Sequence, residues 1–153
     1  MSARLSGGRI GLATFVGFFI ASNLNWAIAT FLLNPWAMPL FDGFMRTGDD
    51  GASGLNIAKM ALGFLPALLV SVSLLIVLPR PEGWASRAIV ATLLVCFPAF
   101  FGTYTFLSGW GDVNWVPLMG AAVADTLCIG IGTLVSGLML RQGLAAAPLA
   151  AAS

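Results

Sequence analysis

One carboxylate stands inside a stretch that is otherwise typical of a membrane helix. Asp125 lies in "GAAVADTLCIGIG", residues 120–132, and this stretch holds no Lys, Arg or second acid. A charge at the centre of a bilayer is costly, so intramembrane acids are rare and generally mark ion or proton sites. The other role open to such an acid is packing against a hidden counter-ion. The position therefore predicts a polar intramembrane site, whose chemistry depends on its partners.

Three other polar residues are candidates for the same site. At roughly 1.5 Å per residue, Asn25 and Asp125 both fall some 4–5 Å outward of the middle of their apolar runs. Ser136 lies close to the face of Asp125 at about 100° per residue. Lys59 stands at the outer mouth of a third run, about 10 Å higher by the same rise, and needs a tilt, a kink or water to reach the acid. We therefore expect Asp125 to face Asn25, with Ser136 and Lys59 as further members of the site.

Asn23 requires a separate explanation. It is two residues from Asn25, hence about 200° around a helix, so the two amides cannot serve one interface. An outward amide without a partner in hydrocarbon is unfavourable. Asn23 therefore either contacts another copy, a different subunit or a polar ligand, or it bonds its own helix backbone. The sequence leaves both alternatives open.

The sequence lacks the residue combinations that the common types of membrane enzyme need. "GWGD", residues 109–112, matches the G-x-G-D motif of intramembrane aspartyl proteases, which need two carboxylates close enough to share a proton. Asp112 and Asp125 are roughly 20 Å apart along a helix, and no other apolar run supplies an acid. The chain has no His, which removes most zinc sites and the imidazole base. Cys96 and Cys128 form no C-x-x-C pair. We expect no enzyme, no cofactor and no metal.

Composition places these residues in a membrane. Of the 153 residues, 59% are hydrophobic and 8% charged, whereas a soluble domain is about one quarter charged. The net charge of +1 gives no indication of nucleic-acid binding. A transmembrane helix needs roughly 20 apolar residues. The fold class is therefore an all-α membrane protein, a four-transmembrane-helix bundle in one domain, residues 1–142, followed by a disordered Ala-rich tail, 143–153. The predicted spans are residues 10–33, 58–78, 87–107 and 116–140.

The distribution of arginines predicts the orientation. Arginines flank the start of the first span, the loop between the second and third spans, and the end of the fourth, whereas acids gather in the other two loops. By the positive-inside rule, both termini are expected in the cytoplasm. The expected location is the inner membrane of the cell. An alternative is a signal peptide cleaved after Ala27-Ile28-Ala29. The bulky residues Asn23, Asn25 and Trp26 and the apolar run that continues beyond them favour an uncleaved span.

Small residues at four-residue spacing predict where the helices meet, because they permit close backbone approach. "NPWAMPL" at 34–40 and "NWVPL" at 114–118 add a weak hint of an internal repeat of two helical hairpins. The expected packing residues are Ala13, Gly17, Ala21, Gly63, Ala67, Gly120, Ala124, Cys128 and Gly132.

The third run is aromatic and contains a proline. Pro98, like Pro66 in the second run, removes a helix hydrogen bond and predicts a kink. Kinks of this kind are most often structural, since neighbouring helices satisfy the freed carbonyls. We interpret the aromatic side chains of this run as bulk packing rather than as a cage for a cation. They are Phe97, Phe100, Phe101, Tyr104 and Phe106.

Two functional hypotheses follow. In the first, the chain is a proton- or cation-linked small-solute transporter or channel-like protein, acting as an oligomer around Asp125. In the second, it is a non-catalytic accessory subunit or assembly factor of a larger membrane complex, with Asp125 and Asn23 as docking points. The expected partners are the lipid bilayer and either further copies or another membrane subunit. A purely structural Asp125 is the third alternative.

Overall fold

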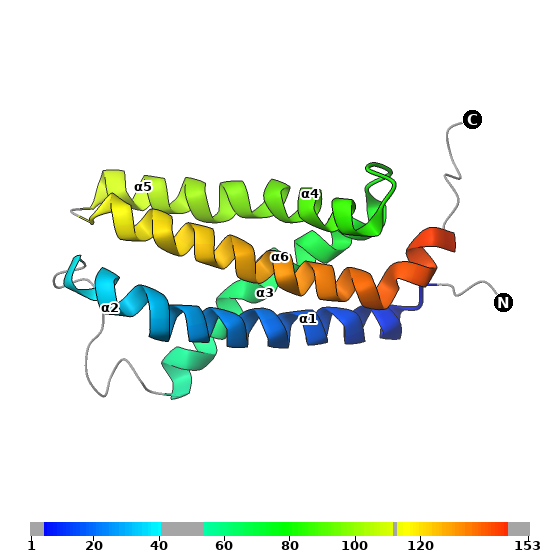
Figure 1. Ribbon diagram of the computed structural model, residues 1–153, viewed down its shortest axis with the longest axis horizontal. Coiled ribbons are helices and arrows are strands. Elements are labelled where there is room, and N and C mark those ends of the chain that lie inside the picture. Colours follow the sequence, from blue (N-terminus) through cyan, green and yellow to red (C-terminus); the bar gives the residue numbers. More distant parts are fainter. Residues whose placement is uncertain (1–4, 41–53, 112, 147–153) are drawn as a thin grey trace.

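The structure is a computed structural model that describes residues 5–40, 54–111 and 113–146, and all regular structure in these ranges is helical. Four helices lie side by side, and two of them change geometry part-way along their length through a π-helical turn, η1 or η3 (Figure 1). The elements are α1 (Gly7–Ile28), η1 (Ala29–Leu33), α2 (Asn34–Ala37), η2 (Met38–Leu40), α3 (Gly54–Val77), α4 (Trp84–Cys96), η3 (Phe97–Gly102), α5 (Thr103–Trp110) and α6 (Trp115–Ala146).

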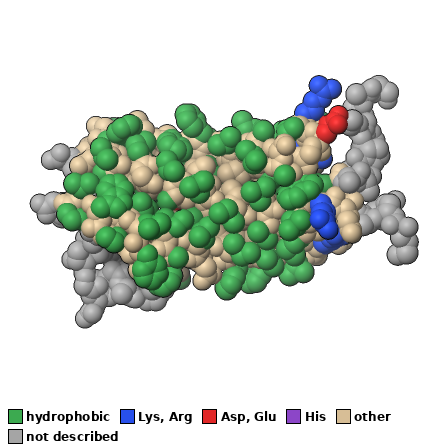
Figure 2. Space-filling model, viewed as in Figure 1, with side chains coloured by type: hydrophobic (Ala, Val, Ile, Leu, Met, Phe, Trp, Pro, Cys, Tyr) green, Lys and Arg blue, Asp and Glu red, His purple; other side chains and the backbone are tan. Residues whose placement is uncertain are grey.

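Three of the four helices are long and apolar enough to cross a membrane. They are Gly7–Ala37, Trp84–Trp110 and Trp115–Leu144. Each extends beyond the span predicted at that place, 10–33, 87–107 and 116–140. In the fourth helix, α3, the apolar part Ala61–Val77 is shorter, and α3 runs obliquely behind the other helices (Figure 1). Hydrophobic side chains cover the visible flank of the molecule (Figure 2). The described part is thus all-helical and suited to a membrane, and the two-hairpin repeat stays a prediction.

Helix α6 forms the centre of the bundle, between α1 and the helix that contains α4 and α5 (Figure 1). Its contact with α1 is a backbone contact. A Cβ built on Gly132 would lie 2.7 Å from the Gly17 carbonyl oxygen and 3.1 Å from Ala21 Cβ. The Ser136 hydroxyl donates to the Ala13 carbonyl, 2.9 Å away on α1. Close approach of this kind takes the place of the hydrophobic effect between helices in lipid.

The other predicted packing residues divide into two groups. Ala67, Ala124 and Cys128 are buried, and a Cβ on Gly120 would lie 3.1 Å from the Trp36 ring. The expectation for Gly63 is wrong. Gly63 is exposed, and no atom of the described residues lies within 4 Å of a Cβ built there. Four-residue spacing on α3 matches Ala67 but drifts off the buried face toward the start of the helix, because α3 crosses its neighbours at an angle.

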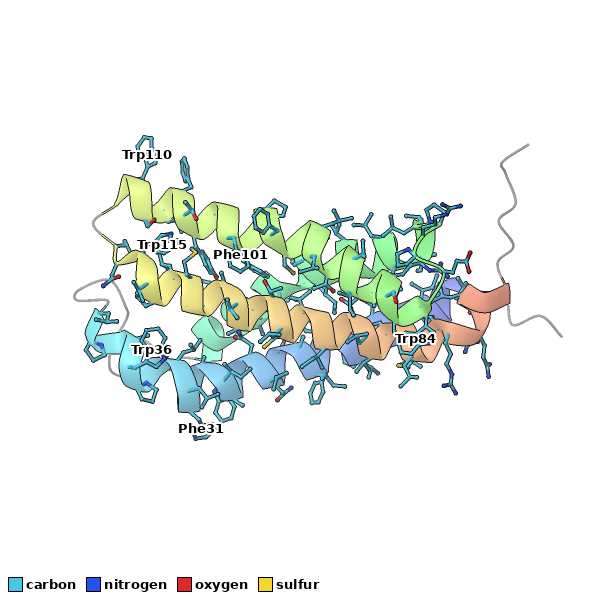
Figure 3. All side chains as sticks on the ribbon, turned by 45° about the horizontal axis from the view of Figure 1, so that its top comes forward. Phe31, Trp36, Trp84, Phe101, Trp110 and Trp115 are labelled. Atoms are coloured by element: carbon cyan, nitrogen blue, oxygen red, sulfur yellow. The ribbon has the colours of Figure 1, made fainter. Side chains whose placement is uncertain are left out.

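The two ends of the bundle differ in character. The start of α1 and the end of α6 lie at one end, and Lys and Arg side chains gather there (Figures 1 and 2). Arg9 in α1 donates to the Met139 carbonyl of α6 at 2.9 Å and so ties the two helices together. Trp84 lies at this end, whereas Trp36, Trp110 and Trp115 lie at the other (Figure 3). Helix α6 continues to Ala146, with Leu144 buried, so residues 143–146 are helical rather than part of a disordered tail.

Each of the two π-helical turns has a proline in it or close behind it, whereas Pro66 lies inside α3 without a π turn. Pro98 lies inside η3, and Pro35 lies two residues after the end of η1, as the second residue of α2. A proline has no N–H to donate, and its ring clashes with the carbonyl four residues earlier. A π turn adds one residue to the helical turn and relieves that clash while the helix continues. Each π turn therefore shifts every residue beyond it by one position relative to an uninterrupted α-helix.

Candidate functional site

The Asp125 carboxylate lies inside the bundle and accepts hydrogen bonds from two other helices. The residue is 8% exposed. The Asn25 amide nitrogen, on α1, donates to Oδ1 at 2.7 Å. The Tyr104 hydroxyl, on α5, donates to Oδ2 at 2.8 Å. The site therefore joins three helices, and each carboxylate oxygen has one donor.

The position of Asn25 follows from the contact between α1 and α6. Asn25 comes one turn after Ala21, which is buried against Gly132. Asp125 comes about two turns before Gly132 on the same face of α6. Because the two backbones approach so closely, the short side chains of Asn25 and Asp125 reach each other directly. The structure thus brings together the two residues that sequence depth paired.

Tyr104 is the member of the site that the sequence interpretation missed. We expected its ring to serve bulk packing with the neighbouring phenylalanines, and for its hydroxyl this was wrong. The chain has eleven Phe and one Tyr, so this run carries its only phenol. A buried tyrosine hydroxyl normally has a hydrogen-bond partner. A single tyrosine within a run of phenylalanines was therefore the sequence feature that could have indicated a polar contact at Tyr104.

Ser136 and Lys59 are not part of the site. The Ser136 hydroxyl bonds to the carbonyls of Ala13 and Gly132, both at 2.9 Å, in the inner half of the bundle. It lies eleven residues after Asp125, roughly 16 Å along α6 at the rise of a helix. Lys59 is exposed near the start of α3. A shared helical face predicted Ser136, but a shared face does not give a shared depth.

Asn23 is exposed on α1, and its amide nitrogen donates to the Phe19 carbonyl of the same helix at 2.7 Å. This is the second of the two alternatives that the sequence allowed for Asn23. A contact of its remaining amide atoms with a partner stays a prediction.

Two buried thiols lie near the carboxylate. Cys128 on α6 lies beside the Asn25 side chain, and Cys96 on α4 lies beside Thr126. The Thr126 hydroxyl is buried and has no hydrogen-bond partner among the residues that the structure describes. In the same residues, no group of three or more His, Cys, Asp or Glu is close enough to hold a metal ion. The surroundings of Asp125 therefore consist of neutral, weakly polar groups.

The two donors to Asp125 differ in what they permit. The Asn25 amide nitrogen can only donate, so Oδ1 must remain an acceptor. A tyrosine hydroxyl both donates and accepts. If Oδ2 takes up a proton, Tyr104 can rotate its own hydrogen away and accept from the carboxyl. The geometry therefore accommodates one proton at Oδ2 without breaking the contact.

A comparison of the chain with protein-family models, curated proteins and solved structures finds no match.

Proposed function

We propose that this chain is a proton- or cation-linked small-solute transporter or channel-like protein that acts as an oligomer around Asp125. Its setting is the inner membrane of the cell, with four spans and both termini cytoplasmic. The observation that carries the proposal is the pairing of a buried carboxylate with two neutral donors, Asn25 and Tyr104.

A buried carboxylate that only stabilises a fold is normally paired with a cation, because an isolated charge in a medium of low dielectric is expensive. Here neither hydrogen-bond donor carries a charge that offsets the carboxylate. Charge balance then comes from a bound proton or a bound cation, and either one can exchange. Tyr104 favours the proton, since its hydroxyl remains bonded to Oδ2 in both protonation states.

The arginines support the orientation. Arg9, Arg80, Arg87 and Arg141 belong to the segments at the end where α1 starts and α6 finishes. The positive-inside rule assigns this end to the cytoplasm. Asp125 and its partners then lie in the outer half of the bundle. Four helices enclose little volume, so the solute path lies between copies of the chain.

Proton binding is tested by infrared difference spectroscopy of the reconstituted protein between two pH values. The chain has six Asp and Glu in total, so the carboxyl band is assigned by comparing wild type with Asp125→Asn. We expect Asp125→Asn to lose one carboxyl signal while the helical content is unchanged. The matched control is Glu82→Gln, an exposed acid at the arginine-rich end, which should leave that signal in place. Equal spectra for wild type and Asp125→Asn would rule out proton exchange at Asp125.

Transport is tested in liposomes that contain a pH dye and carry a gradient of an alkali cation. Wild type should carry a proton or cation flux, and Asp125→Asn should reduce that flux to the level of empty liposomes. Tyr104→Phe keeps the ring and removes the hydroxyl, so it should retain cation flux but weaken any proton-coupled component. A flux that is independent of Asp125 would refute the proposal.

The accessory-subunit hypothesis is the second candidate, and the exposed amide of Asn23 favours it. In that case the native mass of the detergent-solubilised complex should equal that of this chain together with another subunit. Asn23→Ala or Asp125→Asn should then release the subunit and lower the mass, while the chain itself stays folded. An unchanged mass in both variants, together with a flux that depends on Asp125, would decide for the transporter.

A further inference from the structure

The π turn η3 divides the helix between Trp84 and Trp110 into two unlike halves. The inner half, α4, buries four residues against its neighbours. The outer half, η3 and α5, has no buried residue. Trp110 at its end is 82% exposed. The residues that anchor the inner half are Ala88, Ala91, Thr92 and Cys96.

The two donors to Asp125 stand on opposite sides of their π turns. Asn25 precedes η1 and follows the tightly packed Ala21, so a change in η1 does not move it. The outer end of that helix is also fixed, because Trp36 packs on Gly120 and Ala37 is buried. Tyr104 comes two residues after the end of η3, on the half without buried residues. Asp125 thus has one fixed donor and one donor on a weakly packed segment.

The register of η3 decides which residue faces Asp125. A π turn holds one residue more than an α turn. If η3 became α-helical while α4 stayed in place, every later residue would rotate by about 100° and move outward by about 1.5 Å. Thr103 would then take the position that Tyr104 holds now. Tyr104 would take the position that Thr105 holds now, and because Thr105 is exposed, the phenol would move to the lipid side.

We propose that η3 is a hinge whose conversion between π and α geometry exchanges Tyr104 for Thr103 at Asp125, and so opens the outer side of the site. The shorter Thr103 side chain leaves the space of the phenol ring free above the carboxylate. An apolar groove of about 460 Å³, lined by Leu93, Leu94, Phe97 and Pro98, lies beside the turn. It provides room on the lipid side for η3 to rearrange. This gate rests on the proposed function, since it regulates access to the same carboxylate.

Pro98 and Ala99 provide opposite perturbations of the hinge. Pro98 favours the π turn because it clashes with the α-helical carbonyl of Leu94. Pro98→Ala removes that clash and should favour the α form with Tyr104 turned away. Deleting Ala99 from the Pro98→Ala variant removes the surplus residue. A regular α-helix then returns Tyr104 to Asp125, so the deletion should rescue the contact.

The readout is the signal of the single tyrosine of the chain. In protein labelled with ¹³C at the tyrosine ring carbon that bears oxygen, one NMR resonance reports the hydrogen bond of Tyr104. Wild type gives the bonded position, and Asp125→Ala, which lacks the acceptor, gives the unbonded position. We expect Pro98→Ala to move most of the signal to the unbonded position, and the additional deletion of Ala99 to restore the bonded one. General damage to the helix would not be repaired by removing a residue.

A Pro98→Ala protein that keeps the bonded resonance would overturn the hinge, as would a double variant that stays unbonded. If deletion prevents folding, Pro98→Ala decides alone, with circular dichroism to show that it remains helical. The measurement needs no transport activity. A moving Tyr104 without proton or cation binding at Asp125 would therefore refute the proposed function and leave the hinge intact, and the reverse result would refute the hinge only.

Discussion

Gly17→Ala is expected to destabilise the protein through one added methyl group. A Cβ at Gly17 would meet the Ser136 hydroxyl oxygen and would lie 2.5 Å from the Gly132 carbonyl oxygen. The Gly132 carbonyl belongs to the backbone and cannot rotate away from the added methyl group. The loss in the free energy of unfolding therefore lies toward the upper end of the roughly 1–3 kcal/mol that overpacking a core costs. Loss of the bond from Ser136 to Ala13 adds about 0.6 kcal/mol, the average for such bonds in membranes. The better helix propensity of Ala returns about 1 kcal/mol, which leaves a net loss of about 2–3 kcal/mol.

Gly63→Ala is the matched control, since it makes the same chemical change in another helix of the bundle. Gly63 is exposed, and a Cβ there would have no atom of the described residues within 4 Å, so only the helix propensity acts, with a gain of up to about 1 kcal/mol. Gly17→Ala should therefore be less stable and Gly63→Ala more stable than wild type, and their free energies of unfolding should differ by about 3–4 kcal/mol. Unfolding in detergent mixed with increasing dodecyl sulfate, followed by circular dichroism, measures the difference. If Gly17→Ala proves as stable as Gly63→Ala, the backbone contact between α1 and α6 does not hold the bundle together.

Three further predictions test other parts of the fold. Ser136→Ala should lose about 0.6 kcal/mol and no more than about 1.7 kcal/mol in the same unfolding assay; a larger loss would mean that Ser136 has a role beyond its bond to Ala13. Gly137→Ala should cost less than Gly17→Ala, because its Cβ would lie 3.0 Å from the Trp84 ring, a side chain that can shift; a cost equal to that of Gly17→Ala would show that this ring is fixed. A topology reporter fused at Glu82 should read as cytoplasmic, and an external signal would reverse the orientation.

The sequence predicts features that depend on one helix alone, but it does not predict features that depend on how the helices cross. Hydropathy and length predicted three helices that the structure also has, because a long apolar run has few alternatives in a membrane. Periodicity placed Gly17 and Gly132 on buried faces, where local spacing is sufficient. It failed at Gly63 and at Ser136. The crossing angle of α3 decides the first, and depth within the bundle decides the second, so neither follows from the local pattern of one helix.

Tyr104 shows why the site itself was only half predictable. Along α1 no π turn intervenes between Ala13 and Asn25, and three turns of about 3.6 residues from Ala13 reach residue 24, within one position of the amide that bonds Asp125. Along the helix of α4, four such turns from the buried Ala88 reach residue 102 or 103, and an uninterrupted α-helix would present Thr103 to the carboxylate. The π turn at Pro98 supplies the missing residue and presents Tyr104 instead. The periodicity of the sequence thus corresponds to one state of the proposed hinge, and the structure corresponds to the other. Pro98, through the π turn that contains it, therefore determines whether the hydroxyl of Tyr104 or that of Thr103 faces Asp125.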